Sequence, residues 1–88
     1  MNILVMCGNG LGSSFMIELN VKKVLKKLGI EAKVDHTDLT SAKSVEADIY
    51  VGAKDIIVNF KKDNIKTVAL ENIMDLNELE TKLLANIN

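Results

Sequence analysis

Residues 2–29 read NILVMCGNGLGSSFMIELNVKKVLKKLG, and this stretch decides the expected fold. Asn2–Met6 is a continuous apolar run, which is typical of a strand buried on both faces. The last part carries apolar residues at helical spacing and closes on Gly29, a residue type favoured at helix C-terminal caps. Three glycines within five residues separate the two parts. The stretch therefore predicts a strand, a glycine-rich turn and a helix in direct succession.

The helix after the turn is expected to be amphipathic. Its apolar stripe consists of Ile17, Val21, Val24, Leu25 and Leu28. The same periodicity puts Glu18, Lys22 and Lys26 on the opposite side. A basic cluster of Lys22, Lys23, Lys26 and Lys27 is interpreted as a solvated face, with a docking surface for an acidic partner as the alternative.

Further strands and helices alternate along the rest of the chain. Strands are expected over Ile30–Asp38, Ala47–Val51 (ended by Gly52) and Ile65–Leu70. In the first of these, alternation puts Ala32, Val34 and His36 on one face, as in a half-exposed edge strand. A short helical turn over Thr40–Val45 and a helix over residues 53–62 connect the strands.

A last helix begins after Asp75, and Glu78 three residues on completes the pattern of a capping box. Its buried stripe is Leu76, Leu79, Leu83 and Ile87. Regular alternation with short connections predicts an α/β fold, a parallel sheet with right-handed crossovers and helices on both faces. The methionines Met6, Met16 and Met74 are expected to fill the core.

Composition bounds the class of protein. The 88 residues predict a single domain spanning 1–88, and 48% apolar residues exclude a disordered chain. A net charge of −1 argues against a nucleic-acid partner. One cysteine excludes an intramolecular disulfide framework, and no apolar run is long enough for a signal peptide or a membrane span. A reducing, cytoplasmic location is therefore expected.

The glycine-rich turn favours anion binding by a cysteine loop. Glycines let successive backbone N–H groups converge on one point, and the helix that follows adds its unpaired N–H groups and the positive end of its dipole. A thiol at the front of such a loop is acidified, and the thiolate is the nucleophilic form. Cys7 is thus the expected acceptor of a phosphoryl group. The expected phosphate loop comprises Gly8, Asn9, Gly10, Leu11, Gly12, Ser13 and Ser14.

Other interpretations of the turn compete with this one. Gly8, Gly10 and Gly12 come close to the dinucleotide pattern, followed by Asp35 or Asp38, but the second glycine interval is one residue short. A Walker loop needs a lysine that is missing here. A purely structural turn with a buried cysteine needs fewer glycines.

The spacing also separates transfer from hydrolysis. Protein tyrosine phosphatases place an arginine six residues after the cysteine, where this chain has Ser13, and no proline is present for an Asp-Pro general acid. A loop without these groups is suited to carry a phosphoryl group rather than to hydrolyse its ester. A phosphatase-like hydrolase and a non-catalytic, anion-sensing regulatory module are the alternatives.

The segment CGNGLGSS and the helix after it resemble the enzyme IIB component of the bacterial phosphoenolpyruvate-dependent sugar phosphotransferase system, in its ascorbate and galactitol branches with the lactose/cellobiose-type fold plan. The resemblance implies a phosphotransferase with strand order 2-1-3-4. In that family a IIA protein passes phosphoryl from a phosphohistidine to the IIB cysteine, which hands it to a sugar or sugar-like substrate held by the membrane protein IIC. Cys7 is the matching cysteine, and peripheral association with a membrane permease follows.

The rim of such a site is expected from residues late in the second strand and after the third and fourth strands. The candidates are His36, Lys54, Asp55 and Asn72, with Glu71 beside Asn72. A structural histidine is the alternative interpretation for His36, and ordinary polar loop residues are the alternative for the others. A single cysteine and a single histidine offer no metal site, so neither a metal nor another cofactor is expected.

Overall fold

A computed structural model of the chain describes residues 1–7, 13–60 and 65–87. It contains one sheet of four parallel strands in the order β2-β1-β3-β4. The strands are β1 (Asn2–Cys7), β2 (Lys33–Asp38), β3 (Ile49–Ala53) and β4 (Lys66–Leu70). The helices are α1 (Ser13–Leu28), α2 (Leu39–Ala42), α3 (Lys54–Ile57) and α4 (Leu76–Ile87). The expected fold class and strand order are confirmed.

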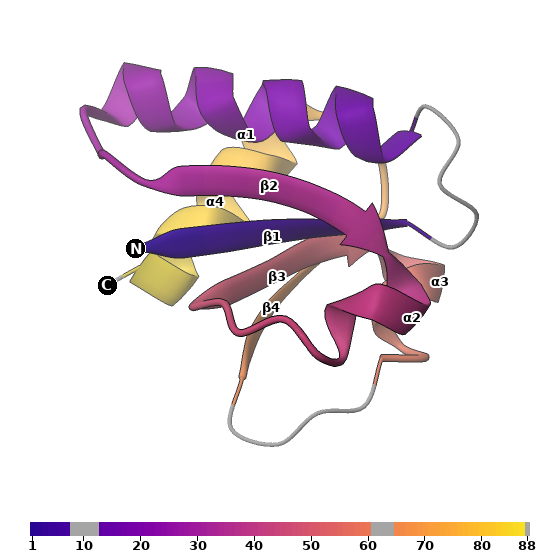
Figure 1. Cartoon of the computed structure of the whole chain (residues 1–88). Coiled ribbons are helices and arrows are strands. Elements are labelled where there is room, and N and C mark those ends of the chain that lie inside the picture. The colour runs from indigo at the N-terminus through magenta and orange to yellow at the C-terminus, as the bar shows by residue number, and fades with distance from the viewer. Residues whose placement is uncertain (8–12, 61–64, 88) are drawn as a thin grey trace.

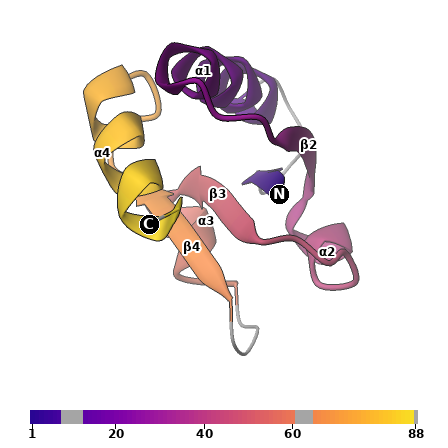
Figure 2. The ribbon, with the colours of Figure 1, turned by 90° about the vertical axis from the view of Figure 1, so that its left-hand side faces the viewer.

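Helices cover both faces of the sheet, as Figures 1 and 2 show. The long helices α1 and α4 share one face, and the short helices α2 and α3 lie on the other. Alternate residues of β1 feed two separate cores: Ile3 and Val5 pack with α1 and α4, whereas Leu4 and Met6 pack with Ala42 of α2 and the α3 side. This two-sided burial explains the unbroken apolar run of β1.

Helix α1 ends where Gly29 was expected to end it. Gly29 has φ 71°, and the N–H groups of Gly29 and Ile30 donate to the carbonyls of Lys26 and Leu25. This is a Schellman cap, in which Ile30 belongs to the helix end. The expected strand over Ile30–Asp38 therefore starts later, at Lys33. Within β2, Val34 is buried, while Lys33 and Asp35 are exposed, as predicted for an edge strand.

Strand β3 does not end at Gly52, contrary to the sequence-based prediction. It continues through Gly52 to Ala53, and Gly52 pairs with Ala69 of β4. A Cβ atom on Gly52 would lie 3.1 Å from the Met6 carbonyl oxygen and 3.4 Å from Cδ1 of Ile57. The glycine thus permits close approach of β1 and α3 rather than a turn.

The helix expected over residues 53–62 is much shorter, because α3 covers only Lys54–Ile57. Turns at 58–59 bring Phe60 into the core, where its ring lies 5.1 Å from the ring of Tyr50. Burial of this aromatic ring favours the turn over further helix in a segment rich in β-branched residues.

Helix α4 is capped by Asp75, whose Oδ1 accepts from the N–H groups of Asn77 and Glu78 at 3.0 and 3.1 Å. Leu79 and Leu83 are buried as expected, but Leu76 is exposed at the first turn. Met6 is a core residue, whereas Met16 and Met74 are exposed, so the prediction that they fill the core is wrong.

Candidate functional site

Cys7 is the last residue of β1, at the carboxyl edge of the sheet. β1 lies between β2 and β3, and Cys7 stands level with Asp38, the last residue of β2. Helix α1 begins at Ser13, so strand and helix are joined by five residues. Of the expected phosphate loop, Gly8, Asn9, Gly10, Leu11 and Gly12 lie outside the described residues, as do the side chains of Cys7, Ser13 and Ser14. Ligands of open parallel sheets bind at this edge.

The Asp38 carboxylate beside Cys7 serves the adjoining helix α2. Its Oδ1 accepts from the Ser41 N–H at 2.7 Å, the geometry of an N-terminal cap. Hydrogen bonds from the Ser41 side chain and backbone hold the pKa of Asp38 below its ordinary value. Asp38 therefore remains ionised, and it is both the last residue of β2 and the N-terminal cap of α2.

His36 contacts α1 through the carboxylate of Glu18, a residue that helical periodicity predicts on the side opposite the apolar stripe. His36 Nδ1 lies against Oε1 of Glu18, and Lys22 Nζ lies 2.8 Å from Glu18 Oε2. Glu18 is 9% exposed, so its expected place on the solvated side of the helix is wrong. Burial raises the pKa of Glu18, but the hydrogen bonds from Lys22 and His36 outweigh burial, and the net shift is downward. His36 thus fastens β2 to α1.

A second polar contact holds the other flank of α1. Asn20 is 6% exposed, and its Nδ2 donates to the Ile73 carbonyl at 3.3 Å, in the loop between β4 and α4. Glu18 and Asn20 lie in the second turn of α1. Together they fix the helix against both β2 and the loop after β4, close to the end of the helix that follows the cysteine segment.

Lys54, Asp55 and Glu71 lie together where β3 and β4 end. They line an open depression of about 500 Å³ with Ala53, Val58 and Leu70. Lys54 Nζ lies 3.6 Å from Glu71 Oε1, and both side chains are well exposed. The structure therefore brings these rim candidates to the edge at which β1 ends.

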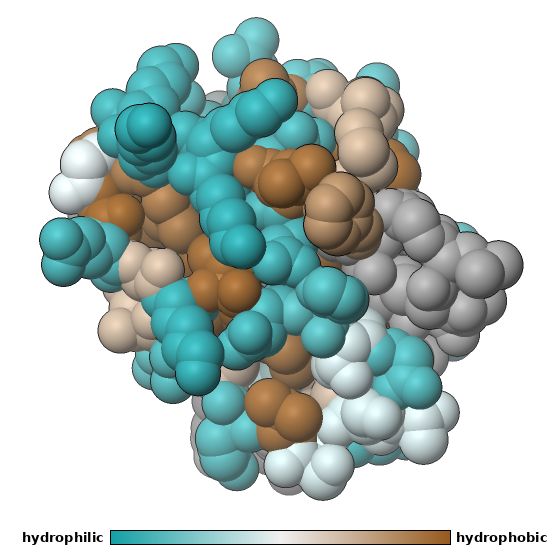
Figure 3. Space-filling view, turned by 45° about the horizontal axis from the view of Figure 1, so that its top comes forward, coloured by the Kyte–Doolittle hydropathy of each residue, from teal (hydrophilic) through white to brown (hydrophobic). Residues whose placement is uncertain are grey.

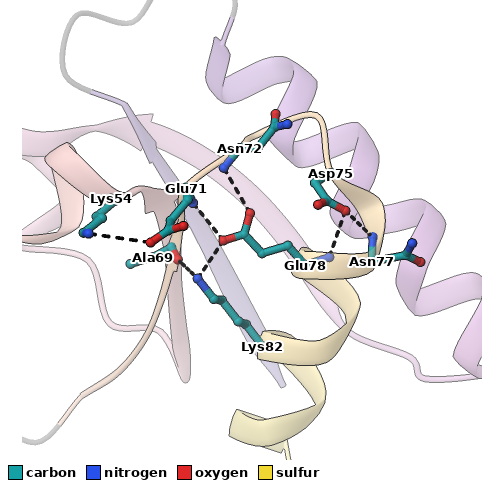
Figure 4. Close-up of polar contacts among 8 residues, drawn as sticks. All are labelled: Lys54, Ala69, Glu71, Asn72, Asp75, Asn77, Glu78 and Lys82. Carbon is teal, nitrogen blue, oxygen red and sulfur yellow. Dashed lines mark hydrogen bonds and ion pairs between the residues drawn. The ribbon is translucent and has the colours of Figure 1, made fainter.

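Asn72 belongs to a loop that Glu78 organises (Figure 4). The Glu78 carboxylate accepts from the N–H groups of Glu71 and Asn72 at 2.8 and 3.0 Å, and Lys82 Nζ lies 2.7 Å away. Lys82 also donates to the Ala69 carbonyl at 2.7 Å. The Asn72 side chain accepts from the Met74 N–H, which is a local turn contact. Glu78 therefore does not close a capping box onto Asp75, as the sequence pattern suggested, but holds the loop after β4.

Glu78→Gln is expected to destabilise the protein at neutral pH. Hydrogen bonds from Lys82 and from the Glu71 and Asn72 N–H groups lower the pKa of Glu78 to about 2. Glutamine offers one acceptor oxygen and turns an NH₂ group toward a donor, so we expect Tm to fall by roughly 5 °C. The measurement is thermal unfolding by circular dichroism between pH 2 and pH 7.

The difference between wild type and Glu78→Gln should depend on pH in one direction. A depressed carboxylate pKa stabilises the fold above the unfolded-state value, near 4.5, and this stabilisation disappears as pH falls toward about 2. The Tm difference should therefore narrow between pH 5 and pH 2. Glu80→Gln is the control, because Glu80 lies on the same helix as Glu78 and pairs with Lys27 of α1, and this change should cost less. A pH-independent difference for Glu78→Gln would contradict the assignment.

The exposed side chains of α1 are apolar in the first half of the helix and basic in the second half. Phe15, Met16 and Leu19 are exposed in its first half, and Figure 3 shows brown, apolar side chains among the teal, polar ones on this side of the molecule. The lysine cluster of the second half, Lys22, Lys23, Lys26 and Lys27, is exposed as predicted. Lys22 and Lys27 pair with Glu18 and Glu80. The apolar end of the helix is the end nearest the carboxyl edge.

The described ranges, 1–7, 13–60 and 65–87, contain neither a cluster of metal ligands nor a membrane-spanning helix. No group of three or more His, Cys, Asp or Glu side chains there is arranged to hold a metal ion. Within the same ranges, no helix has the length and apolarity needed to span a bilayer.

Known proteins resemble the chain over nearly its full length. Residues 2–85 match the family described as the lactose/cellobiose-specific IIB subunit of the phosphotransferase system. The chain is also 35% identical over 86 residues to the ascorbate-specific phosphotransferase system EIIB component of Mycoplasma pneumoniae. That alignment covers 94% of this chain and 90% of the relative.

Proposed function

The chain belongs to the lactose/cellobiose-type IIB family of the phosphotransferase system and is a sugar phosphotransferase component, and on that premise we propose that Cys7 is its phosphoryl carrier. Cys7 accepts a phosphoryl group from a phosphohistidine of a IIA protein and passes it to a carbohydrate bound by a membrane IIC protein. The domain acts in the cytoplasm at the inner face of that permease.

The first transfer forms a P–S bond and breaks a P–N bond. The Cys7 thiolate attacks phosphorus in line, and the donor imidazole leaves with the electron pair and takes up a proton. In the second transfer a substrate hydroxyl oxygen attacks, the P–S bond breaks, and the hydroxyl proton ends on the released sulfur or in solvent. Positioning and N–H groups around the phosphoryl oxygens are the usual sources of rate in such chemistry.

One observation carries the proposal: the chain's only cysteine ends β1 at the carboxyl edge, and α1 begins six residues later. The intervening GNGLG sequence contains three glycines, which add backbone N–H groups and no side chains, and the helix start favours an anion. A thiol in this position is expected to ionise easily. The arginine that a phosphatase loop would carry is replaced by Ser13, which favours transfer over hydrolysis.

Both protein partners are proposed to cover the same surface in turn. Each must reach Cys7, so IIA and IIC bind one after the other and transiently. Exposed Phe15, Met16, Leu19 and Met74 support such a surface, since exposed apolar side chains are typical of recognition sites. Their placement on the first half of α1 and on the loop after β4 is consistent with contact around the carboxyl edge.

The proposed substrate is ascorbate-like, because the relative with 35% identity is named as ascorbate-specific. Galactitol-like substrates are the second candidate, from the sequence motif. Substrate choice is expected to reside mainly in IIC.

The test is phosphorylation of the purified chain by a phosphorylated ascorbate-type IIA protein. We expect the mass of one phosphoryl group to be gained, on the peptide that contains Cys7, and to be lost again only slowly in water. Prior alkylation of the thiol should prevent the gain. Rapid steady hydrolysis of an aryl phosphate would favour the phosphatase alternative, and no gain at all would favour the anion-sensing module.

A further inference from the structure

We propose that Lys54 is the counter-ion of phosphorylated Cys7 and that Glu71 holds it in the unphosphorylated state. The inference deepens the proposed function and rests on it. In this scheme Lys54 exchanges its partner as the phosphoryl group arrives and returns to Glu71 when the group leaves.

The order of the strands puts Lys54 beside the end of β1. β3 is the direct neighbour of β1, and Val5 pairs with Val51. Two residues further on, β1 ends at Cys7 and β3 ends at Ala53, so Lys54 is the first residue after the adjacent strand. Neighbouring strands are about 4.8 Å apart, and lysine carries its charge on a flexible four-carbon stem. Lys54 is therefore within reach of a group on Cys7.

The present partner of Lys54 lies on the side away from β1. Glu71 follows β4, which flanks β3 on its other edge, and its Oε1 is 3.6 Å from Lys54 Nζ. Lys54 thus stands between the cysteine strand and the glutamate, and Figure 4 shows the two side chains directed at one another. Movement of the lysine alone exchanges one anion for the other.

The Lys54–Glu71 pair is weak enough to be exchanged. The side chains are 63% and 69% exposed, and ion pairs with such exposure contribute little to stability. A phosphoryl group carries about −1.5 to −2 charges at neutral pH and offers three acceptor oxygens. It therefore competes well with a single exposed carboxylate.

The backbone of Glu71 is held in place by Glu78. Its N–H donates to Glu78 Oε2 at 2.8 Å, and Lys82 ties Glu78 to the Ala69 carbonyl. The Glu71 carboxylate is thus an alternative partner on the β4 side of Lys54. Its removal should leave Lys54 free for the site at all times.

The experiment compares Lys54→Met, Glu71→Gln and the double variant in two assays. One assay measures the Cys7 thiol pKa from the pH dependence of iodoacetamide alkylation, and the other measures the rate of phosphoryl gain from phosphorylated IIA. Lys54→Met should raise the thiol pKa by about half a unit and slow the gain about fivefold. Glu71→Gln should lower the pKa and speed the gain about twofold, and Lys54→Arg should behave like wild type.

Two controls separate an exchange of partners from a general effect of charge. Asp55→Asn removes a carboxylate that lines the same depression. Its effect on both assays should be the same in the wild-type background and in the Lys54→Met background. The effect of Glu71→Gln should vanish in the Lys54→Met background. Lys33→Met breaks an equally exposed pair with Asp35, 4.0 Å away at the opposite end of the sheet, and should change neither assay.

The outcomes distinguish this inference from the function on which it rests. A wild type that gains no phosphoryl overturns the proposed function, and the counter-ion role of Lys54 falls with it. If Lys54→Met gains phosphoryl as fast as wild type and its Cys7 thiol has the same pKa, the inference alone is overturned. A Glu71→Gln effect that persists in the Lys54→Met background also overturns it.

Discussion

Cys7→Ser is expected to lower the rate of phosphoryl gain from IIA by at least about a thousandfold. Cysteine thiols have a pKa near about 8.5 and are partly ionised near neutral pH, whereas serine hydroxyls are not, and the ionised form is the nucleophile. The measurement is the mass of the intact chain after incubation with phosphorylated IIA. Fold stability should stay within about 2 °C of wild type, since one sulfur atom is replaced by oxygen.

Mapping the phosphoryl group makes this prediction specific to the cysteine. The single histidine of the chain, His36, could also carry a phosphoryl group, on a nitrogen of its imidazole ring. In wild type, the group should be found on the peptide that contains Cys7 and not on the peptide that contains His36. A Cys7→Ser protein that folds and still gains phosphoryl at a tenth of the wild-type rate would disprove the assignment of the carrier.

The sheet could be predicted because its strands are marked by local patterns. Asn2–Met6 is an apolar run, and so is the Ile49–Val51 part of the expected strand Ala47–Val51; their burial on both faces follows from the alternation of strands and helices. Gly29 marked the end of α1 correctly, since a left-handed residue is required there. Gly52 was misread, because the same residue type also serves close packing between strands and helices, and only the tertiary contacts distinguish the two uses.

The polar contacts around the site were less predictable, because they join residues far apart in sequence. Glu18 lies at the border of the apolar stripe of α1, and only the neighbouring His36 on β2 determines whether it is buried. Glu78 fits a capping box, but the folded loop offers it two N–H groups and a lysine instead. Charged residues after strands, by contrast, gather at one edge in any parallel sheet, and Lys54, Asp55 and Glu71 were therefore predictable.

Gly52→Val is expected to lower the free energy of unfolding by about 3 kcal/mol, which corresponds to a fall in Tm of roughly 15 °C. The added Cβ meets the Met6 carbonyl oxygen at 3.1 Å and the Ile57 side chain at 3.4 Å. Ile57 can turn aside, but the Met6 oxygen belongs to β1, which is paired on both sides. The extra volume must push β1 and β3 apart. Urea or thermal unfolding measures the loss.

Gly29 provides the matched control, because there the cost has a different origin. Its φ is 71° and a Cβ would meet nothing within 4 Å, so Gly29→Ala should cost about 1 kcal/mol through backbone conformation alone. Asparagine tolerates this conformation, so Gly29→Asn should cost less, whereas Gly52→Asn should remain strongly destabilising. Met6 precedes Cys7 directly, so Gly52→Val should also slow phosphoryl gain under conditions in which the variant is folded. A Gly52→Val protein as stable as wild type would mean that the end of β1 yields easily, and the strands would then not hold Cys7 in a fixed position.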